Sequence, residues 1–438
     1  MATQTTLNSS LQFFVKEMAI ILPSGKPIDL TGVFSEINFY ESVFTPCRSG
    51  NVLVTESIGL YDKIDIKSNM TIRFKIQKSK DDVDFFEYYK EFKIYNVTNR
   101  KNLSSTSQSY VLHFVNEDFV YSLQNKVAQS YYGPYSTIAQ KILTNNLKVV
   151  NSKPSKGKSG INYIYPTSVG KEFVMPNLTP FDSLTWLSKR SVSTKWKVPD
   201  FLFFENNSGY NFVPVCYLWE TPSQWTINVK PKNLLNSPTN VATEFLGARD
   251  MKILSQFNML TNIKDGSYAG TFVGFDTFTK TISVQKIDNT FDSTEEHGNK
   301  NSTLKNTISK NNTDFTQMYD SRVVIYPFAL PRTTQSYIKE KSPKTSSVID
   351  DTHKYIFQRR AFFSNFMQKR IELTMPGNFG LTCGTVITLN VPKFAVKEDE
   401  KNTDDTLSGK YIILGVRHII RYKTHETIIE ITTDSTRK

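Results

Sequence analysis

The stretch Met375–Pro392 reads MPGNFGLTCGTVITLNVP and contains a Pro-Gly-Asn turn, a short link with two further glycines, and a strand-like run. The segment before it reads QKRIELT, and after a charged loop the chain continues SGKYIILGVRHIIRYKTHETIIEIT. Apolar and polar residues alternate in both flanking segments, with many β-branched side chains, as in half-buried strands. The stretch therefore predicts a turn that joins strands in a β-rich part of the chain.

Length and composition set the limits for the rest of the molecule. The chain has 438 residues, which predicts about three domains at roughly 150 residues each. Hydrophobic residues make up 39% and aromatic residues 13%, enough to build folded cores. No segment approaches the roughly 20 apolar residues of a membrane span, and the N-terminus lacks the pattern of a secretory signal. We expect a folded protein that is made and kept in the cytoplasm.

Cysteine content and charge exclude several classes of site. Three cysteines, Cys47, Cys216 and Cys383, are widely spaced and form no CxxC pair, so a disulfide framework or thiolate metal site is not expected. They are predicted to be buried or half-buried thiols. The net charge of +12 is spread along the chain and not clustered. The sequence also lacks zinc-finger spacing, a P-loop and a GxGxxG turn, which weakens the hypothesis of a nucleic-acid-binding module.

The first 120 residues alternate apolar and polar positions over short runs that are separated by turn residues. The runs are VFSEINFYESVF, NVLVTESIGLYDKIDI, NMTIRFKIQ, FKIYNVTN and SYVLHFVN. Period-two alternation with turns at this density is typical of antiparallel strands in a barrel or a sandwich. The first domain is therefore predicted to be all-β or nearly so.

A helix-containing region is predicted to begin near residue 126. Ser136 is a candidate N-cap for a helix that continues towards Leu147, and Thr179 or Asp182 for a helix that ends near Val192. Pro180 suits the first turn of the second helix. FLFFENNSGYNFVPV indicates a hairpin with its turn at residues 207–209, and residues 350–367 indicate a third helix ending near residue 366.

The later part of the chain returns to a strand pattern. A new β signal reads MLTNIKDGSYAGTFVGFDTFTKTISVQ, and strands are expected again from about residue 369 to Ile431. Between them, STEEHGNKNSTLKNTISKNNTDF has too few apolar residues to build a core. This polar stretch is interpreted as a long surface loop, with its order left open.

No catalytic, cofactor-binding or metal-binding residue is predicted. The five histidines, His113, His297, His353, His418 and His425, show no HExxH or HxH spacing, and a structural or solvent-exposed role is expected for them. Glu41 and Glu205 are the candidates for a paired-carboxylate site of a hydrolase, although nothing in the sequence connects them. The sequence therefore favours a protein that is not an enzyme.

Seven segments, taken in order, carry a resemblance to a known family. They are GVFSEINFYESVFTPCRSGNVLVTES, FKIYNVTNRKNLSSTSQSYVLHFVNEDFVYS with QSYYG, MPNLTPFDSLTWLSKRS, FLFFENNSGYNF, GSYAGTFVGFDTFTKT, GNFGLTCGTVITLNV and LSGKYIILGVRHII. Together they resemble the central baseplate hub protein of contractile-tailed bacteriophages of the T-even type. The resemblance covers nearly the whole chain, and it rests on the order and spacing of strands and turns. The polar stretch around residues 293–315 matches no part of that family.

The resemblance implies an α+β fold, mainly β, with two antiparallel β-barrel domains like those of the tail-tube protein and an inserted helix-containing domain. The implied domains are residues 1–125 for the first barrel, 126–255 with 288–368 for the middle domain, and 256–287 with 369–438 for the second barrel. Strands near residues 256–287 would pair with those after residue 369. The pattern Gly377, Asn378, Phe379, Leu381 and Gly384 resembles the turn into a strand of the second barrel, where glycine permits a close backbone approach.

The resemblance also implies partners and a location. Three chains would form a homotrimer with six barrels in a ring, a structural virion protein that adapts the hexameric tail tube to the trimeric central spike. The implied partners are the spike, the tube or a tube-initiator protein, other baseplate proteins, and viral DNA only in passage, with no membrane span and no cofactor. The protein would be assembled in the host bacterial cytoplasm and would reside in the tail baseplate.

Two related roles and two unrelated roles stay open as alternatives. The chain could be the spike-base protein of a bacterial contractile secretion system or a siphophage tail hub, and a cell-wall hydrolase and a basic nucleic-acid-binding module are further alternatives. If three chains enclose a DNA channel, a lumen rich in Lys and Arg would hold phosphates. We therefore expect the surplus positive charge to lie on outer or intersubunit surfaces and the lumen to be neutral or acidic.

Overall fold

The N-terminal residues form the strands that their alternating pattern predicts. A computed structural model of the protein describes residues 13–64, 66–67, 70–77, 87–150, 158–168, 171–229, 246–275, 280, 282–288, 301–302, 322–327, 352–393, 403–422 and 424–436. The first strands are β1 (Phe14–Ile21), β2 (Pro27–Asp29), β3 (Phe34–Ser42), β4 (Ser49–Glu56), β5 (Thr71–Gln77), β6 (Glu87–Asn102) and β7 (Gln108–Val115), with α1 (Leu60–Ile64) between β4 and β5. Buried and half-buried positions alternate strictly along β4 and β5 and along most of β7. This alternation places one apolar face of each strand in a shared core.

The middle of the chain contains the predicted helices. Its elements are α2 (Glu117–Gln124), β8 (Ser130–Gly133), α3 (Tyr135–Lys141) with a π-helical turn at Ile142–Asn146, β9 (Ile161–Ile164), β10 (Lys171–Val174), α4 (Pro180–Ser188), β11 (Phe201–Asn206), β12 (Gly209–Pro214) and α5 (Val215–Glu220). The predicted hairpin is confirmed, because β11 and β12 pair antiparallel on either side of residues 207–208. The Thr179 hydroxyl accepts from the backbone N–H of Asp182, as an N-cap does, and Pro180 occupies the first turn of α4.

Two helix details predicted from the sequence are wrong. Ser136 does not cap α3, because the helix begins one residue earlier, after Pro134, and the Ser136 N–H donates to the hydroxyl of Thr167 at 3.0 Å. That partner comes from a distant segment, which no local pattern could indicate. Helix α4 ends at Ser188 and not near Val192, and beyond its end the Ser191 hydroxyl donates to the carbonyl of Leu187 at 2.8 Å.

The C-terminal half returns to strands, as expected. Its elements are β13 (Trp225–Val229), β14 (Gly247–Ala248), β15 (Asp250–Ser255), α7 (Met259–Lys264), β16 (Ala269–Phe275), β17 (Ile282–Asp288), β18 (Asn301–Ser302), β19 (Val323–Pro327), α10 (Thr352–Phe366), β20 (Lys369–Pro376), β21 (Val386–Asn390), β22 (Gly409–Arg421), β23 (Thr424–Thr433) and β24 (Ser435–Thr436). Helix α10 confirms the third predicted helix. Apart from β18, the polar stretch of residues 293–315 lies outside the described residues.

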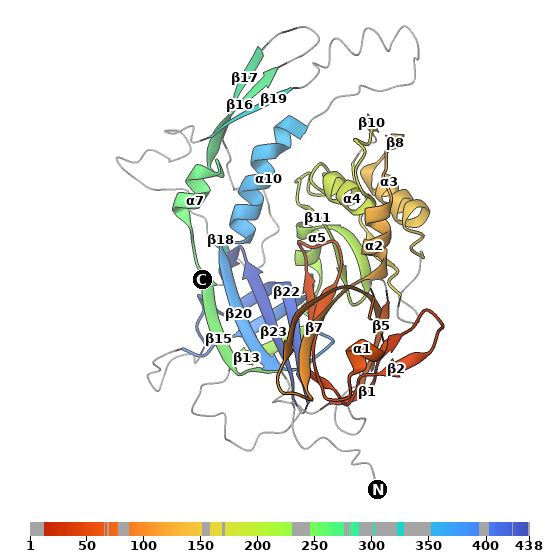
Figure 1. Ribbon diagram of the computed structural model, residues 1–438. Helices are drawn as coiled ribbons and strands as arrows, with labels where there is room; N and C mark the ends of the chain where they lie inside the picture. The colour runs from red at the N-terminus through yellow and green to blue at the C-terminus, as the bar shows by residue number, and fades with distance from the viewer. Residues whose placement is uncertain are drawn as a thin grey trace.

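One large sheet connects the two β-rich halves (Figure 1). Its strand order is β14-β13-β21-β22-β3-β4-β7-β6-β5-β1-β2, and β23, β20 and β15 branch from it through β22. Strand β22 joins the halves, because its residues Gly415–Arg421 pair with β3 while it also pairs with β21 and β23. The fold is therefore mainly β, with the helices α2, α3 and α4 grouped above the sheet in Figure 1.

The pairing expected for residues 256–287 is wrong among the described residues. Strands β16 and β17 do not join the strands after residue 369; they form a separate three-stranded sheet with β19. Strand β20 pairs with β23 on one side and, on the other, with β15, antiparallel from Asp250 to Ser255. The alternating pattern predicts that strands exist but does not specify which strand pairs with which, since long-range register depends on side-chain packing.

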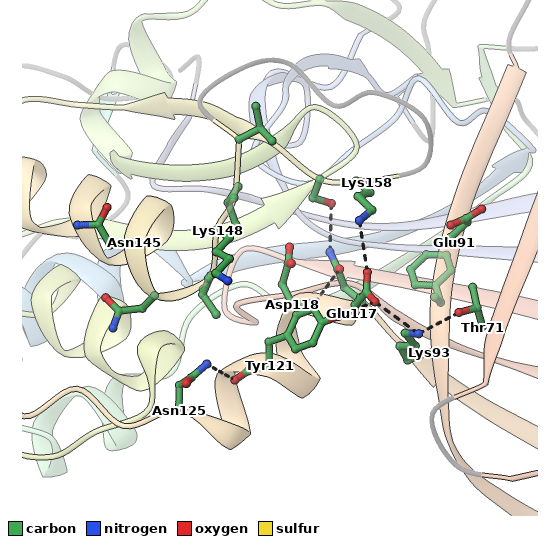
Figure 2. Close-up of a pocket in the computed structure, with 17 residues that line it drawn as sticks. Thr71, Glu91, Lys93, Glu117, Asp118, Tyr121, Asn125, Asn145, Lys148 and Lys158 are labelled. Carbon is green, nitrogen blue, oxygen red and sulfur yellow. Dashed lines mark hydrogen bonds and ion pairs between the residues drawn. The ribbon is translucent and has the colours of Figure 1, made fainter. Parts of the chain in front are cut away.

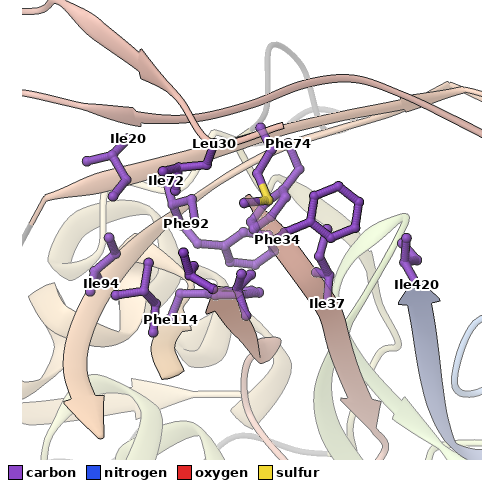
Figure 3. Packing of buried hydrophobic residues seen from close by; sticks show 14 of the residues in the cluster. Ile20, Leu30, Phe34, Ile37, Ile72, Phe74, Phe92, Ile94, Phe114 and Ile420 are labelled. Carbon is purple, nitrogen blue, oxygen red and sulfur yellow. The ribbon is translucent and has the colours of Figure 1, made fainter. Parts of the chain in front are cut away.

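Four buried apolar clusters fill the molecule, and the opening stretch connects three of them. The first cluster lies under β1 and β3–β7, where phenylalanines 34, 74, 92 and 114 pack together (Figure 3). Phe379 inserts into that cluster, Leu381 into the cluster under β20–β23, and Cys383 into a cluster beneath β11 and β12. Three alternate residues of one short link thus anchor three cores. The remaining cluster lies among the helices of the middle region.

Phe379 makes the most extensive of these contacts. Its ring stacks on Tyr88 with centroids 4.4 Å apart and lies 4.6 and 4.5 Å from the rings of His418 and His425. Gly377 lies close to His425, and the Gly377 N–H donates to the His425 carbonyl at 2.7 Å. The stretch that predicts a turn from its sequence therefore fixes one half of the molecule against the other.

Candidate functional site

A buried arginine lies where the three regions meet. Arg48 follows β3 in the turn before β4 and is only 2% exposed. Its Nε and Nη2 atoms donate to Glu205 Oε1 at 3.0 and 2.9 Å, and its backbone N–H donates to Oε2 at 3.0 Å. Glu205 belongs to β11, so this charged pair joins the N-terminal strands to the middle region. Charge-assisted bonds of this kind are stronger than neutral hydrogen bonds.

Further donors surround the Glu205 carboxylate. Asn116 Nδ2 donates to Oε1 at 2.7 Å, and the Ser159 hydroxyl also donates to Oε1. Burial alone would raise the pKa of Glu205, but the charge of Arg48 and these hydrogen bonds hold that pKa below its usual value. Glu205 is therefore ionised and fully paired in the interior.

Glu41 is a second buried carboxylate beside the same arginine. It lies on β3, and its Oε1 atom is 3.9 Å from Arg48 Nη1. Its Oε2 atom accepts from the Thr382 hydroxyl at 2.5 Å and from the Cys383 N–H at 3.4 Å. Burial raises the pKa of Glu41, and Arg48 and Thr382 only partly oppose that effect. Through Thr382 the network extends into the link that follows β20.

The structure thus brings together the two glutamates that sequence considerations left unconnected. They share Arg48, and they are 7% and 1% exposed. A paired-carboxylate hydrolase needs both groups in an open cleft, with room for the substrate and a water molecule. Here the two carboxylates are enclosed by Arg48, Thr382, Ser159 and Asn116. Their arrangement supports a structural role, as a polar joint between the three regions.

A cleft of about 790 Å³ adjoins this joint, and Figure 2 shows the side chains that line the cleft. Its lining residues are Thr71, Glu91, Phe92, Lys93, Asn116, Glu117, Asp118, Tyr121, Asn125, Asn145, Asn146, Leu147, Lys148, Val149, Val150, Lys158 and Ser159. Two of them, Asn116 and Ser159, also contact Glu205, so the cleft lies directly over the joint. Its walls come from β5 and β6 on one side and from the middle region on the other.

Ion pairs bridge these walls. Lys93 of β6 lies 3.4 Å from Glu117 of α2 and donates to the Thr71 hydroxyl at 3.0 Å. Lys158 lies 4.0 Å from the other oxygen of Glu117. Positive and negative side chains therefore lie side by side along the cleft. The cleft is a polar seam between the N-terminal strands and the middle region, and it matches a uniformly charged ligand poorly.

Asp118 makes the stability of the folded state at this seam depend on pH. The Tyr210 hydroxyl donates to its carboxylate at 2.9 Å, while burial and the nearby charge of Glu205 raise its pKa from 3.8 to about 7. A raised pKa means that the folded state binds the proton more tightly than the unfolded chain. The stabilisation of the folded state by this bound proton is complete below the ordinary aspartate pKa, and it is lost as the pH rises towards 7.

We therefore expect Asp118→Asn to remove this dependence. The stability advantage of the variant over wild type should grow as the pH rises from about 4 to about 7, because the variant cannot ionise. Urea unfolding at several pH values measures the difference, with Asp250→Asn at an exposed site as the control. Parallel pH profiles for wild type and Asp118→Asn would contradict the assignment.

Among the remaining candidate residues, the three cysteines and two of the histidines are buried. The three cysteines form no disulfide, and their burial is as predicted. His418 and His425 are buried, with His425 Nε2 3.3 Å from His418 Nδ1, and His113 bonds to the Thr98 hydroxyl at 2.8 Å. His353 lies in α10, and His297 lies outside the described residues. Within the described ranges no cluster of three or more potential metal ligands occurs, and no helix is long and apolar enough to cross a membrane.

Comparison with known proteins identifies the fold through solved structures. Neither a protein-family model nor a curated protein sequence matches the chain. A tail protein from Neisseria meningitidis is 10% identical, with a TM-score of 0.52, and the match covers 97% of both chains. The 43 kDa tail protein of prophage MuSo2 from Shewanella oneidensis is 8% identical, with a TM-score of 0.51, over 96% of this chain and 99% of that one.

A third solved structure scores lower. It is a Francisella PdpA-VgrG complex, 8% identical with a TM-score of 0.46, and the match covers 97% of this chain and 53% of that chain. The two structures with higher scores match from end to end, so the likeness includes the arrangement of all regions. The chain therefore has the fold of a phage tail protein, which confirms the kind of fold that the sequence resemblance implies.

Proposed function

We propose that the chain is a structural protein of a phage tail baseplate, the trimeric central hub that adapts the hexameric tail tube to the trimeric spike. The observation that carries the proposal is the match of the whole fold to two tail proteins, one of them from a prophage, over nearly their entire length. Its partners would be two further copies of itself, the spike, the tube or a tube initiator, and other baseplate proteins. Viral DNA would pass through its channel, and the protein would reside in the virion after assembly in the host cytoplasm.

Two tube-like units in each chain would make this adaptation possible. We assign the first barrel to β1–β7 and the second to β13, β15 and β20–β23, each with its own apolar core. Three chains would then place six similar units around one axis, and closed symmetric rings require such matched units. The domain boundaries at residues 125, 255, 287 and 368 stay a prediction. Because β13 pairs with β21 and β15 pairs with β20, residues 225–229 and 250–255 are better grouped with the second unit.

The joint at Arg48 supports a structural role over an enzymatic one. A hub transmits load between the tube and the spike, and a buried network that ties three cores together resists relative motion of the units. The enclosed positions of Glu41 and Glu205 argue against the hydrolase alternative. The spike-base protein of a contractile secretion system and the siphophage hub are variants of the same structural role, and only the partners would separate them.

An exposed apolar sheet face supports assembly with other chains. The register of β16, β17 and β19 aligns Val273, Val284 and Ile325 in one row, and Val284 and Ile325 are 63% and 74% exposed. Phe275 and Ile282 form the next row of this face and are also exposed. The opposite face packs on α10. Exposed apolar surfaces of this kind mark protein interaction sites.

Light scattering on the purified full chain tests the proposal. We expect a mass three times the 50.2 kDa of one chain, and the double variant Val284→Asp with Ile325→Asp should lower that mass. The control is Leu103→Asp, because Leu103 is 58% exposed on the hairpin between β6 and β7. A single-chain mass for the wild type, with no growth on adding a spike protein, would contradict the hub assignment.

A further inference from the structure

A second cleft, of about 580 Å³, lies between α7, α10 and the start of β20. Its lining residues are Ser255, Asn258, Thr261, Asn262, Asp265, Arg322, Arg360, Phe363, Ser364, Met367, Gln368 and Arg370. Three arginines and one aspartate are the charged groups of this lining. The cleft is therefore positively charged, in contrast to the mixed charges of the cleft above the Arg48 joint.

The three arginines are only partly neutralised. Arg370 pairs with Glu430 at 3.1 Å, and Arg322 lies 3.5 Å from Asp265, with its side chain 42% exposed. Arg360 Nη1 is buried and has no hydrogen-bond partner among the described residues. A buried guanidinium N–H without an acceptor costs free energy, so an acceptor from outside would be stabilising there.

Arg322 and Arg360 also act on each other. Burial lowers the pKa of Arg360, and the neighbouring cation of Arg322 lowers it further, with Asp265 opposing. Two arginine side chains that line one cleft repel each other, and this repulsion remains in the free protein. An anion placed between them would relieve this repulsion and satisfy the free Nη1 of Arg360.

We propose that this cleft binds a carboxylate side chain on an extended segment of a partner polypeptide. Arginine matches a carboxylate with two parallel hydrogen bonds, and Asn258, Asn262 and Ser364 offer further polar contacts. Phe363 and Met367 line the same cleft and would contact an apolar residue next to the carboxylate. The inference rests on the proposed function, because it gives an assembly partner of the hub a docking point.

The shape and lining of the cleft favour a polypeptide over nucleic acid. A duplex presents a regular row of phosphates and is held by basic groups spread along a surface. Here the arginines gather in one confined cleft beside apolar side chains. Phe257, just before α7, and Leu260, within it, are 74% and 70% exposed and extend the apolar surface next to Asn258 and Thr261. A segment that alternates acidic and apolar residues fits this combination.

Fluorescence anisotropy on the full-length protein tests the inference. The probe is a short labelled peptide of alternating glutamate and phenylalanine, compared with the same peptide carrying glutamine in place of glutamate. We expect the glutamate peptide to bind, and Arg360→Gln and Arg322→Gln each to weaken binding about tenfold or more, since each removes a charge-assisted bond. Arg421→Gln, half-exposed and paired with Glu36 and Glu426, is the matched control and should bind as wild type.

Competitors separate the possible ligands. Excess inorganic phosphate should displace the peptide only weakly, and duplex DNA should not displace it. Equal binding of the glutamine peptide, unchanged binding by both cleft variants, or displacement by DNA at lower concentration than by unlabelled peptide would each overturn the inference. Arg322→Gln keeps the test decisive if Arg360→Gln misfolds, because Arg322 is partly exposed. A single-chain mass in light scattering that does not grow when a spike protein is added would refute the hub and leave the peptide result unaffected.

Discussion

Replacement of Arg48 with methionine is expected to lower the free energy of unfolding by about 3–5 kcal/mol. The substitution leaves two buried carboxylates, Glu41 and Glu205, without their shared cation. Methionine fills a similar volume, so the loss reports the uncompensated charge more than a cavity. Urea unfolding of the full chain measures the effect. The transition at the lowest urea concentration should shift most, to still lower urea, because the joint connects all three regions.

Two further variants make this prediction specific. Arg421→Met removes a half-exposed arginine from an ion pair and should cost less than about 1 kcal/mol. The double variant Arg48→Met with Glu205→Gln should regain part of the lost stability, because the amide removes one unpaired buried charge. If Arg48→Met were as stable as Arg421→Met, the buried joint would not hold the regions together.

Gly377→Ala is expected to destabilise the protein by about 1–3 kcal/mol, or more, through overpacking. A Cβ atom at this position would lie 2.0 Å from Cγ and 2.2 Å from Nδ1 of His425. The His425 ring is fully buried and is held against Phe379 and His418, so it has little room to move. The clash should loosen the contact of the link with both β-rich halves, and thermal unfolding would report it as a lower midpoint.

Gly32→Ala is the matched control for this substitution. No atom lies within 4 Å of the Cβ that it would add, so its effect should stay within about 0.5 kcal/mol. A Gly377→Ala variant that unfolds at the same temperature as Gly32→Ala would show that the link does not lock the histidine pair in place.

Local patterns predicted the elements well, because strands and helices follow from side-chain periodicity. The alternation of β4, β5 and β7, the hairpin of β11 and β12, the cap at Thr179 and helix α10 are all present. Each depends on residues a few positions apart. The ordered strands also carried the resemblance to phage hub proteins, and the whole-chain fold matches confirm a tail-protein fold.

The joint could not be predicted, because its members are far apart in the sequence. Glu41 and Glu205 are separated by most of the first β region and most of the middle region, and Arg48 lies in a turn that predicts only a change of direction. An arginine in a turn is usually exposed, so its burial has no local signal. The pairing of β15 with β20 was missed for the same reason, since β16 and β17 have an equally good strand pattern.

Electron cryomicroscopy of the full-length protein tests the central claim most directly. The hub assignment predicts a threefold ring in which each chain contributes two β units, so that six similar units surround a channel whose wall is neutral or acidic. A monomer, a ring of another symmetry, or a channel wall rich in lysine and arginine would contradict it.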